Sequence, residues 1–199
     1  MRVLIADDEA VIRMGLRTML EDKGHQVVAS AVDGASAVQM TRTERPEVIL
    51  LDIKMPGMDG IEAARKIMQE RPTPIVMLTA FSQRDLVNQA REASVFGYLV
   101  KPVKEDLLDA TLDLAMTRFQ EWKKMQRQVQ DLQKSLEARE VVERAKRVLI
   151  EQQKLSEQQA FNKIHRTSRS RRVTMQQVAQ EILDRQAKEN KTQPKRGGK

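Results

Sequence analysis

The chain has 199 residues, more than one domain of average size requires, and it contains no cysteine, which excludes a disulfide framework and thiolate metal or redox sites. Nothing at the N-terminus resembles a signal peptide, and no apolar run approaches the roughly 18 residues of a membrane span, so we expect a cytoplasmic protein without membrane contact. Residues 1–117 carry 14 Lys and Arg against 18 Asp and Glu, whereas residues 118–199 carry 21 against 10. This asymmetry indicates an acidic control domain joined to a basic module that meets a polyanion, although a solvated helical surface is the alternative.

Five short apolar runs of strand length divide the acidic part of the chain. They are Val3–Ala6, Val27–Ala29, Val48–Leu51, Ile75–Leu78 and Tyr98–Val100. The stretches between them show helical spacing of apolar residues, as in Ile61, Ala64 and Met68. Such alternation predicts an open, doubly wound parallel sheet with helices on both faces. Ligands of these folds bind beyond the carboxyl ends of the strands.

Polar residues stand where four of these predicted strands end: Asp7 and Asp8, Asp52, Thr79 and Lys101. Three carboxylates brought together repel one another, so one keeps a proton or a hard cation joins them. Mg²⁺ fits best, because it prefers oxygen ligands and retains a place for a phosphate oxygen. A carboxylate is also a nucleophile that can form an aspartyl phosphate, with a lysine and a hydroxyl stabilising the transferred charge. A buried ion-pair network without chemistry is the alternative interpretation.

These residues resemble the response-regulator receiver domain, which has a flavodoxin-like five-stranded fold. The segments that carry the resemblance are Leu4–Glu9, Leu51–Gly60, Leu78–Ala80 and Gly97–Pro102. The resemblance implies that a sensor histidine kinase donates a phosphoryl group to Asp52. It also implies a role for each further site residue: Asp7, Asp8, Asp52 and the backbone carbonyl of Lys54 as metal ligands, Thr79 and Tyr98 as switch residues, and Lys101, before a cis Pro102, as the partner of the phosphoryl group. Tyr98 is also consistent with an ordinary core aromatic.

From Lys104 through Gln193 the sequence contains neither proline nor glycine, which favours helix throughout. The apolar residues Trp122, Met125, Val129, Leu132 and Leu136 recur at heptad spacing. This seam predicts a parallel pair of helices from two chains, and we expect a homodimer on activation. A helix packed within one chain is the alternative, because the seam spans only about two heptads.

Two capping boxes, Ser156 to Gln159 and Thr174 to Gln177, divide the basic end of the chain into three predicted helices. The segments Arg139–Lys146, Ser156–Phe161 and Ile164–Arg166 resemble the ANTAR domain of AmiR- and NasR-type antitermination regulators, a three-helix RNA-binding module. The cations that we expect to bind RNA hairpins are Arg139, Lys146, Arg147, Lys163, Arg166, Arg169, Arg171 and Arg172.

The sequence therefore predicts four segments: a receiver over residues 1–117, a coiled-coil linker over 118–137, an ANTAR-like RNA-binding module over 138–186 and a disordered basic tail over 187–199. With only two histidines and no phosphate-cradling glycine-rich loop, we do not expect an ordinary enzyme. The predicted function is that of a two-component response regulator acting as a transcription antiterminator. The alternatives are a DNA-binding transcription factor, which would need a helix-turn-helix, and a pure interaction protein.

Overall fold

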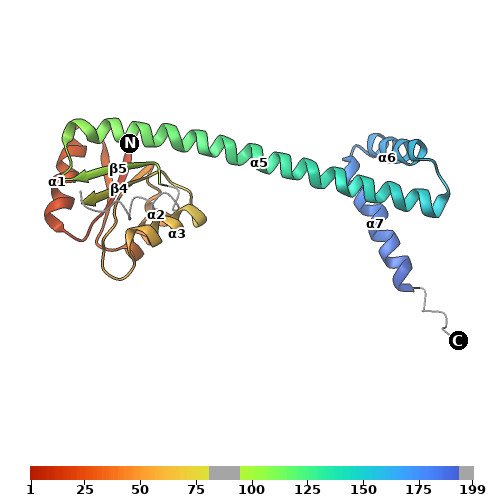
Figure 1. Ribbon diagram of the computed structural model, residues 1–199, viewed down its shortest axis with the longest axis horizontal. Helices are drawn as coiled ribbons and strands as arrows, with labels where there is room; N and C mark the ends of the chain where they lie inside the picture. Colours follow the sequence, from red (N-terminus) through yellow and green to blue (C-terminus); the bar gives the residue numbers. More distant parts are fainter. Residues whose placement is uncertain (81–94, 193–199) are drawn as a thin grey trace. The chain divides into compact units, whose positions relative to one another are not determined.

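The computed structural model describes residues 1–80 and 95–192, and the chain divides into two compact units, Met1–Lys124 and Met125–Lys199 (Figure 1). The first unit contains a five-stranded sheet in the order β2-β1-β3-β4-β5, in which every neighbouring pair is parallel. The strands are β1 (Arg2–Ala6), β2 (Gln26–Ala31), β3 (Val48–Asp52), β4 (Ile75–Ala80) and β5 (Gly97–Lys101). All five predicted strands, and the flavodoxin-like fold, are confirmed.

Helices cover both faces of this sheet. One apolar cluster joins the sheet to α2 (Gly34–Glu44) and α3 (Gly60–Glu70) through residues such as Val38 and Ile67. A second cluster joins it to α1 (Ala10–Asp22) and the beginning of α5 (Glu105–Gln153) through residues such as Leu20 and Leu112. The helix predicted between β4 and β5 falls on residues 81–94, outside the described residues. Because both faces are covered, side chains of the central strand β3 are buried along its whole length.

Aromatic side chains extend the first unit beyond the predicted boundary at residue 117. Phe119 and Trp122 of α5 stack with their ring centroids 5.7 Å apart, and both rings meet Phe96 edge to face. These contacts belong to the second apolar cluster, and the compact unit accordingly runs to Lys124. Trp122, the first residue of the predicted seam, therefore packs in this core, because neighbouring aromatic rings offer it a dry surface within its own chain.

The second unit is an all-helical module built from the end of α5, α6 (Glu157–Arg171) and α7 (Met175–Thr192). Its small core includes Ala145, Ile164 and Ala179. Both predicted capping boxes are present, since the side chains of Ser156 and Thr174 accept hydrogen bonds from the backbone three residues later. Helix α7 continues into the predicted disordered tail, because no proline or glycine interrupts it before Pro194.

No helix in the described part of the chain combines the length and the apolar character that crossing a membrane requires.

Candidate functional site

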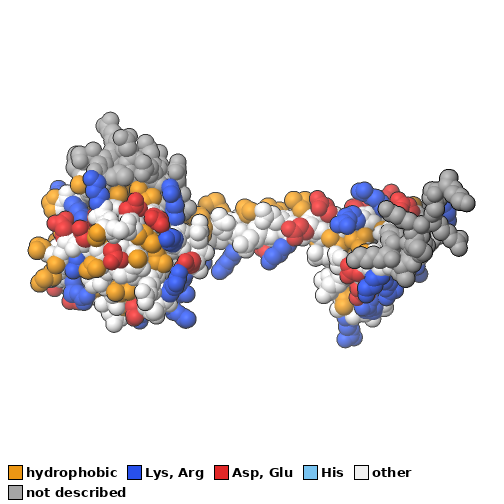
Figure 2. Space-filling model, turned by 90° about the horizontal axis from the view of Figure 1, so that it is seen from below, with side chains coloured by type: hydrophobic (Ala, Val, Ile, Leu, Met, Phe, Trp, Pro, Cys, Tyr) orange, Lys and Arg blue, Asp and Glu red, His pale blue; other side chains and the backbone are white. Residues whose placement is uncertain are grey.

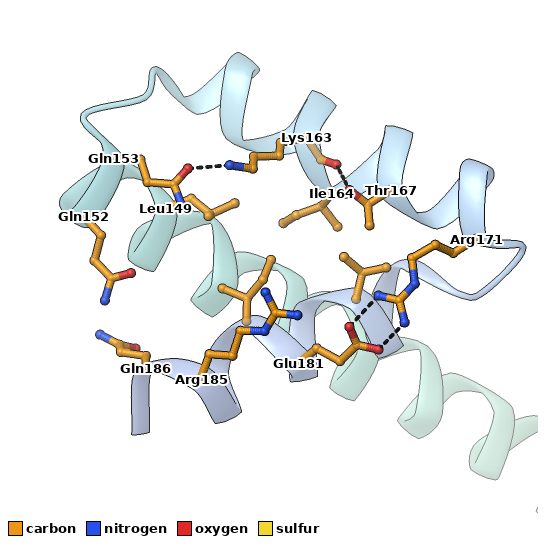
Figure 3. Close-up of a pocket in the computed structure, with 12 residues that line it drawn as sticks. Leu149, Gln152, Gln153, Lys163, Ile164, Thr167, Arg171, Glu181, Arg185 and Gln186 are labelled. Atoms are coloured by element: carbon orange, nitrogen blue, oxygen red, sulfur yellow. Dashed lines mark hydrogen bonds and ion pairs between the residues drawn. The ribbon is translucent and has the colours of Figure 1, made fainter. Parts of the chain in front are cut away.

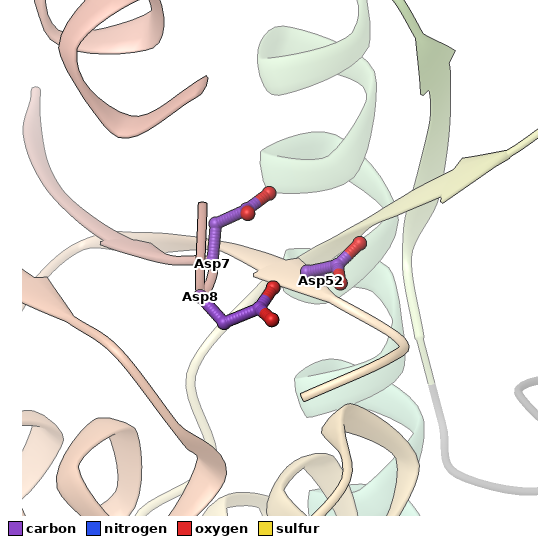
Figure 4. Close-up of side chains that lie close together, drawn as sticks. All are labelled: Asp7, Asp8 and Asp52. Atoms are coloured by element: carbon purple, nitrogen blue, oxygen red, sulfur yellow. The ribbon is translucent and has the colours of Figure 1, made fainter. Parts of the chain in front are cut away.

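Three carboxylates meet at the carboxyl edge of the sheet (Figure 4). Asp7 and Asp8 directly follow β1, and Asp52 is the last residue of β3, so two adjacent parallel strands deliver all three. A ligand oxygen from each lies within 4.8 Å of the others. Asp7 is 0% and Asp52 5% exposed, whereas Asp8 is open to solvent. The predicted convergence of these residues is what the structure shows.

Lys101, the last residue of β5, supplies the positive charge at this edge. Its ammonium lies 2.8 Å from Asp52 Oδ1 and 2.7 Å from Asp7 Oδ2. Burial raises the pKa of Asp52, and although hydrogen bonding and charge from Lys101 oppose the effect, the net shift is upward. Burial on its own lowers the pKa of Lys101, but its close contacts with the charges of both carboxylates outweigh burial and raise that pKa. One ammonium thus faces two buried carboxylates and leaves a net negative site.

Backbone groups fix the orientation of the two buried carboxylates. The Lys54 N–H donates to Asp52 Oδ2 at 3.1 Å, and the Glu9 N–H donates to Asp7 Oδ1 at 2.9 Å. The Arg13 guanidinium donates to the backbone carbonyls of Asp7 and Asp8 at 2.7 and 2.9 Å. Arg13 was not among the predicted site residues; its position on the first helical turns after the acidic pair was the only sequence signal for this role.

The first residue of α3, Gly60, lies so close to the backbone of Asp52 that only glycine fits there. A Cβ atom on Gly60 would stand 1.9 Å from the backbone oxygen of Asp52, and the Gly60 N–H donates to the carbonyl of Ile53. The start of α3 is therefore pressed against the end of β3. This close approach fixes the two ends of the loop that connects β3 to α3.

The residues present fit a divalent cation. Asp7 Oδ2 is buried and, although it lies near the Lys101 ammonium, it accepts no hydrogen bond of regular geometry. Together with the exposed Asp8 carboxylate it offers free oxygen lone pairs, which are the ligands that Mg²⁺ prefers. A cavity of about 300 Å³ opens beside them and is lined by Asp52, Thr79 and Lys101, among others.

Of the two predicted switch residues, only Thr79 lines this cavity. Thr79 is 7% exposed, lines the cavity, and its hydroxyl donates to the Ala80 carbonyl at 3.2 Å. Tyr98 of β5 is half-buried and packs against the first apolar cluster. The peptide bond between Lys101 and Pro102 is cis, as expected. The Lys54 side chain is exposed, so only its backbone takes part in the site.

The second unit carries the cations that were predicted to bind RNA, and the structure divides them into two groups. Lys146 is 7% exposed, and its ammonium bonds to Glu143 at 3.0 Å and to Glu157 at 2.8 Å. These contacts join α5 to the first turn of α6. Arg171 of α6 forms a two-pronged ion pair with Glu181 of α7 at 2.5 and 2.8 Å. Both cations connect helices of the module, and Lys146 offers no exposed charge to a ligand.

The other predicted cations are exposed. Lys163 donates to the amide oxygen of Gln153 and forms no ion pair in the part of the chain that the structure describes. Five arginines form no ion pair within the described residues: Arg139, Arg147, Arg166, Arg169 and Arg172. Figure 2 shows Lys and Arg side chains gathered on the surface of this unit.

Comparison with known proteins identifies both units. The family model of the response regulator receiver domain matches residues 3–113, which is more than half of the chain, and that of the ANTAR domain matches residues 130–183. The chain belongs to the response regulators. Its receiver carries the acidic pair, Asp52, Thr79 and Lys101 at the sheet edge described above, and its ANTAR domain begins within α5.

One relative matches this response regulator along nearly its whole length. The transcriptional regulatory protein PdtaR of Mycobacterium tuberculosis is 45% identical over 183 residues, which cover 92% of this chain and 89% of PdtaR. The chemotaxis protein CheY of Bacillus subtilis is 39% identical over 106 residues, covering 53% of this chain and 88% of CheY. Among solved structures, the receiver domain of the putative response regulator NarL from M. tuberculosis is 35% identical, with a TM-score of 0.54, covering 57% of this chain and 94% of NarL's receiver.

The chain also resembles part of an enzyme. A protein-glutamate methylesterase/protein-glutamine glutaminase of Hahella chejuensis is 47% identical over 105 residues, which cover 51% of this chain but only 30% of that protein. The combination of a receiver with an ANTAR domain is a regulatory arrangement.

Proposed function

We propose that the receiver accepts a phosphoryl group on Asp52 from a sensor histidine kinase and that this change promotes RNA binding by the ANTAR domain. The observation that carries the proposal is the arrangement of Asp8, Asp52 and Lys101 around one open cavity, with the buried Asp7 carboxylate held against Lys101 behind it. A buried ion pair alone would need neither the cavity nor the exposed third carboxylate.

The side chains are suited to phosphoryl transfer. The Asp52 carboxylate attacks phosphorus, so that a P–O bond forms while the P–N bond to the donor imidazole breaks, and the imidazole leaves with its electron pair. Lys101 then exchanges one carboxylate contact for a phosphoryl oxygen, and the Thr79 hydroxyl is free to leave the Ala80 carbonyl and donate to another. Bound Mg²⁺, held by Asp7, Asp8, Asp52 and the backbone carbonyl of Lys54, would neutralise the charge that develops on the transferred group.

The conformational readout proposed for the receiver uses Thr79 and Tyr98. Once Thr79 turns toward a phosphoryl oxygen, it vacates space at the end of β4, next to β5, on which Tyr98 stands. Tyr98 is half-buried, so it has both an inward and an outward environment within reach. Phosphorylation would bias this two-state arrangement.

Pairing of two chains through α5 is the proposed link to the output. Met125, Val129, Leu132 and Leu136 remain 50–65% exposed in the single chain. Apolar side chains line this stretch of helix (orange, Figure 2). Four exposed apolar side chains at heptad spacing form a stripe that a second copy of the helix would cover. The exposed arginines of the ANTAR domain would then be presented in pairs to RNA hairpins, sited near a transcription terminator.

The test compares the binding of a small RNA hairpin and of duplex DNA with equal charge, with and without an acyl-phosphate donor and Mg²⁺. We expect hairpin binding that increases on phosphorylation and that Asp52→Ala makes unresponsive. Leu132→Glu should keep the protein monomeric in sedimentation experiments and reduce the phosphorylation response. Equal or tighter binding of duplex DNA would replace the RNA proposal with that of a DNA-binding transcription factor.

A further inference from the structure

The ANTAR domain contains a cavity of about 270 Å³ at the junction of its three helices (Figure 3). Its floor is apolar and consists of Leu149 from α5, Ile164 from α6, and Val178 and Ile182 from α7. The first three of these side chains are no more than 4% exposed. The floor therefore belongs to the packed core of the module, and among these four residues the half-buried Ile182 offers a ligand most of the exposed apolar surface.

Two interactions hold the polar walls in place. Lys163 donates to the amide oxygen of Gln153 at 2.5 Å, which ties α6 to the end of α5. The Arg171 guanidinium is clamped by both oxygens of Glu181, which ties α6 to α7 and fixes the guanidinium plane beside the cavity. Hydrogen bonding to Glu181 also raises the pKa of Arg171. The walls are thus preorganised by contacts within the module.

At the opening of the cavity, by contrast, lie polar side chains that form no hydrogen bond or ion pair within the described residues. The side-chain amides of Gln152 and Gln186 face each other across the opening in Figure 3, and neither forms a hydrogen bond within the described residues. Arg185 stands beside them and forms no hydrogen bond or ion pair there, although its charge contributes to lowering the pKa of Glu181. Each amide offers two donors and an acceptor, and Arg185 offers a cation.

This combination matches the chemistry of a single nucleobase. An apolar floor takes the faces of a planar ring, while glutamine amides read the donors and acceptors on its edge. The volume lies below the roughly 300–1,000 Å³ of sites for drug-sized ligands, so it suits one ring system and not a stretch of chain. The charges of Lys163 and Arg185, neither of which forms an ion pair within the described residues, would meet the phosphates on either side of the base.

We propose that this cavity binds one unpaired base of an RNA hairpin loop, with Gln152 and Gln186 contacting the edge of the base and Arg185 the neighbouring phosphate. The proposal rests on the RNA-binding function proposed above and specifies how that function is carried out. It predicts that one loop nucleotide contributes to affinity through its base, whereas most of the exposed arginines contribute through the backbone.

The experiment begins by selecting a tightly bound hairpin from a pool with a randomised loop, using the phosphorylated full-length protein. Each loop nucleotide of that hairpin is then replaced by an abasic one, and binding is measured for the wild type and for the Gln152→Ala/Gln186→Ala variant. Gln176→Ala serves as the matched control, because Gln176 is an exposed glutamine of α7 outside the cavity. Circular dichroism checks that the variants keep their helices.

We expect one abasic position to weaken wild-type binding about fivefold or more, the scale of one edge-specific contact. The double glutamine variant should lose a similar factor on the intact hairpin and lose nothing further at that abasic position, since both changes remove the same contact. Gln176→Ala should behave as wild type.

If every abasic replacement weakened binding by the same factor in the wild type and in the double glutamine variant, the cavity proposal would be overturned while the RNA-binding proposal would stand. Adenosine and guanosine monophosphates are titrated in parallel: tight binding of a free nucleotide that the glutamine variant abolishes, with hairpin affinity unaffected, would assign the cavity to a free nucleotide and overturn the RNA assignment. Failure of the selection to yield any binding hairpin would instead count against the proposed function itself.

Discussion

Replacing Lys101 with methionine removes the one cation that the described residues place against both buried carboxylates. Asp7 and Asp52 are almost fully buried, so without the ammonium each faces the other's charge in a poorly solvated site. Removing one partner of a buried ion pair typically costs about 3–5 kcal/mol. Because the pKa of Asp52 is already raised, that carboxyl can take up a proton and limit the loss, so we expect about 3 kcal/mol at pH 7 without metal.

Urea unfolding followed by tryptophan fluorescence measures this loss. Trp122 is the only tryptophan and packs between aromatic rings of the receiver core, so its emission reports the unfolding of that unit. A loss of 3 kcal/mol lowers the urea midpoint by about 1–2 M. The contribution of Lys101 is present in full below the ordinary lysine pKa of 10.5 and is lost only as the pH rises through its raised folded-state value, so the difference should be constant from pH 7 to 9.

Adding Mg²⁺ and including a control variant test whether the loss of stability is electrostatic. The cation neutralises the same carboxylates, so it should raise the midpoint of Lys101→Met more than that of the wild type; at 100 times its dissociation constant it stabilises by about 2.7 kcal/mol. Lys104→Met removes an exposed lysine with no ion pair among the described residues and should unfold like the wild type. Equal metal-free midpoints for Lys101→Met and Lys104→Met would refute the electrostatic reasoning.

Four further substitutions test other parts of the structure. Asp33→Ala removes the N-cap of α2 and should cost about 1 kcal/mol of stability at pH 7; because hydrogen bonding in the cap lowers the pKa of Asp33, the stabilisation should fade as the pH falls below the ordinary value of 3.8, which acid unfolding measures. Gly60→Ala forces a methyl group onto the Asp52 carbonyl, so it should lower the stability by about 3 kcal/mol and slow phosphorylation. Gly15→Ala places its methyl group where no atom lies within 4 Å in the middle of α1, so it should raise the stability by at most about 1 kcal/mol. Urea titrations of both variants measure the difference. Lys146→Met should lower the melting temperature of the ANTAR domain but leave the slope of log affinity against log salt unchanged, while loss of a phosphate-contacting arginine reduces that slope by about one.

The receiver site was predictable because it depends on the ends of strands. Alternating apolar runs set the order of strands and helices, and a parallel sheet brings the ends of its strands to one edge, so Asp7, Asp52 and Lys101 converge whatever the details of packing. The contribution of Arg13 was not predictable in the same way. It donates to main-chain carbonyls, which every residue has, and so leaves no complementary side chain in the sequence.

The ANTAR domain shows where reasoning from charge alone reaches its limit. Lys146 and Arg171 look like their exposed neighbours in the sequence, but each meets a carboxylate ten or more residues away, Glu157 and Glu181, once the helices fold together. Trp122 shows the same limit for apolar residues. Its heptad position is compatible with a seam, and only the placement of Phe96 beside α5 shows that its partner lies in the receiver.

In the proposed mechanism, helix α5 connects the receiver to the ANTAR domain. One uninterrupted helix contributes Leu112 to the receiver core, presents the exposed apolar residues Val129 and Leu132, and contributes Leu149 to the ANTAR core. A change in the receiver surface that favoured pairing would therefore act on the same helix that supplies the floor of the cavity in the ANTAR domain. Since that floor exists in the single chain, pairing need not create the proposed base-binding surface. It need only bring two copies together, which raises the affinity for RNA with two hairpins by effective concentration and requires no conformational change within the ANTAR domain.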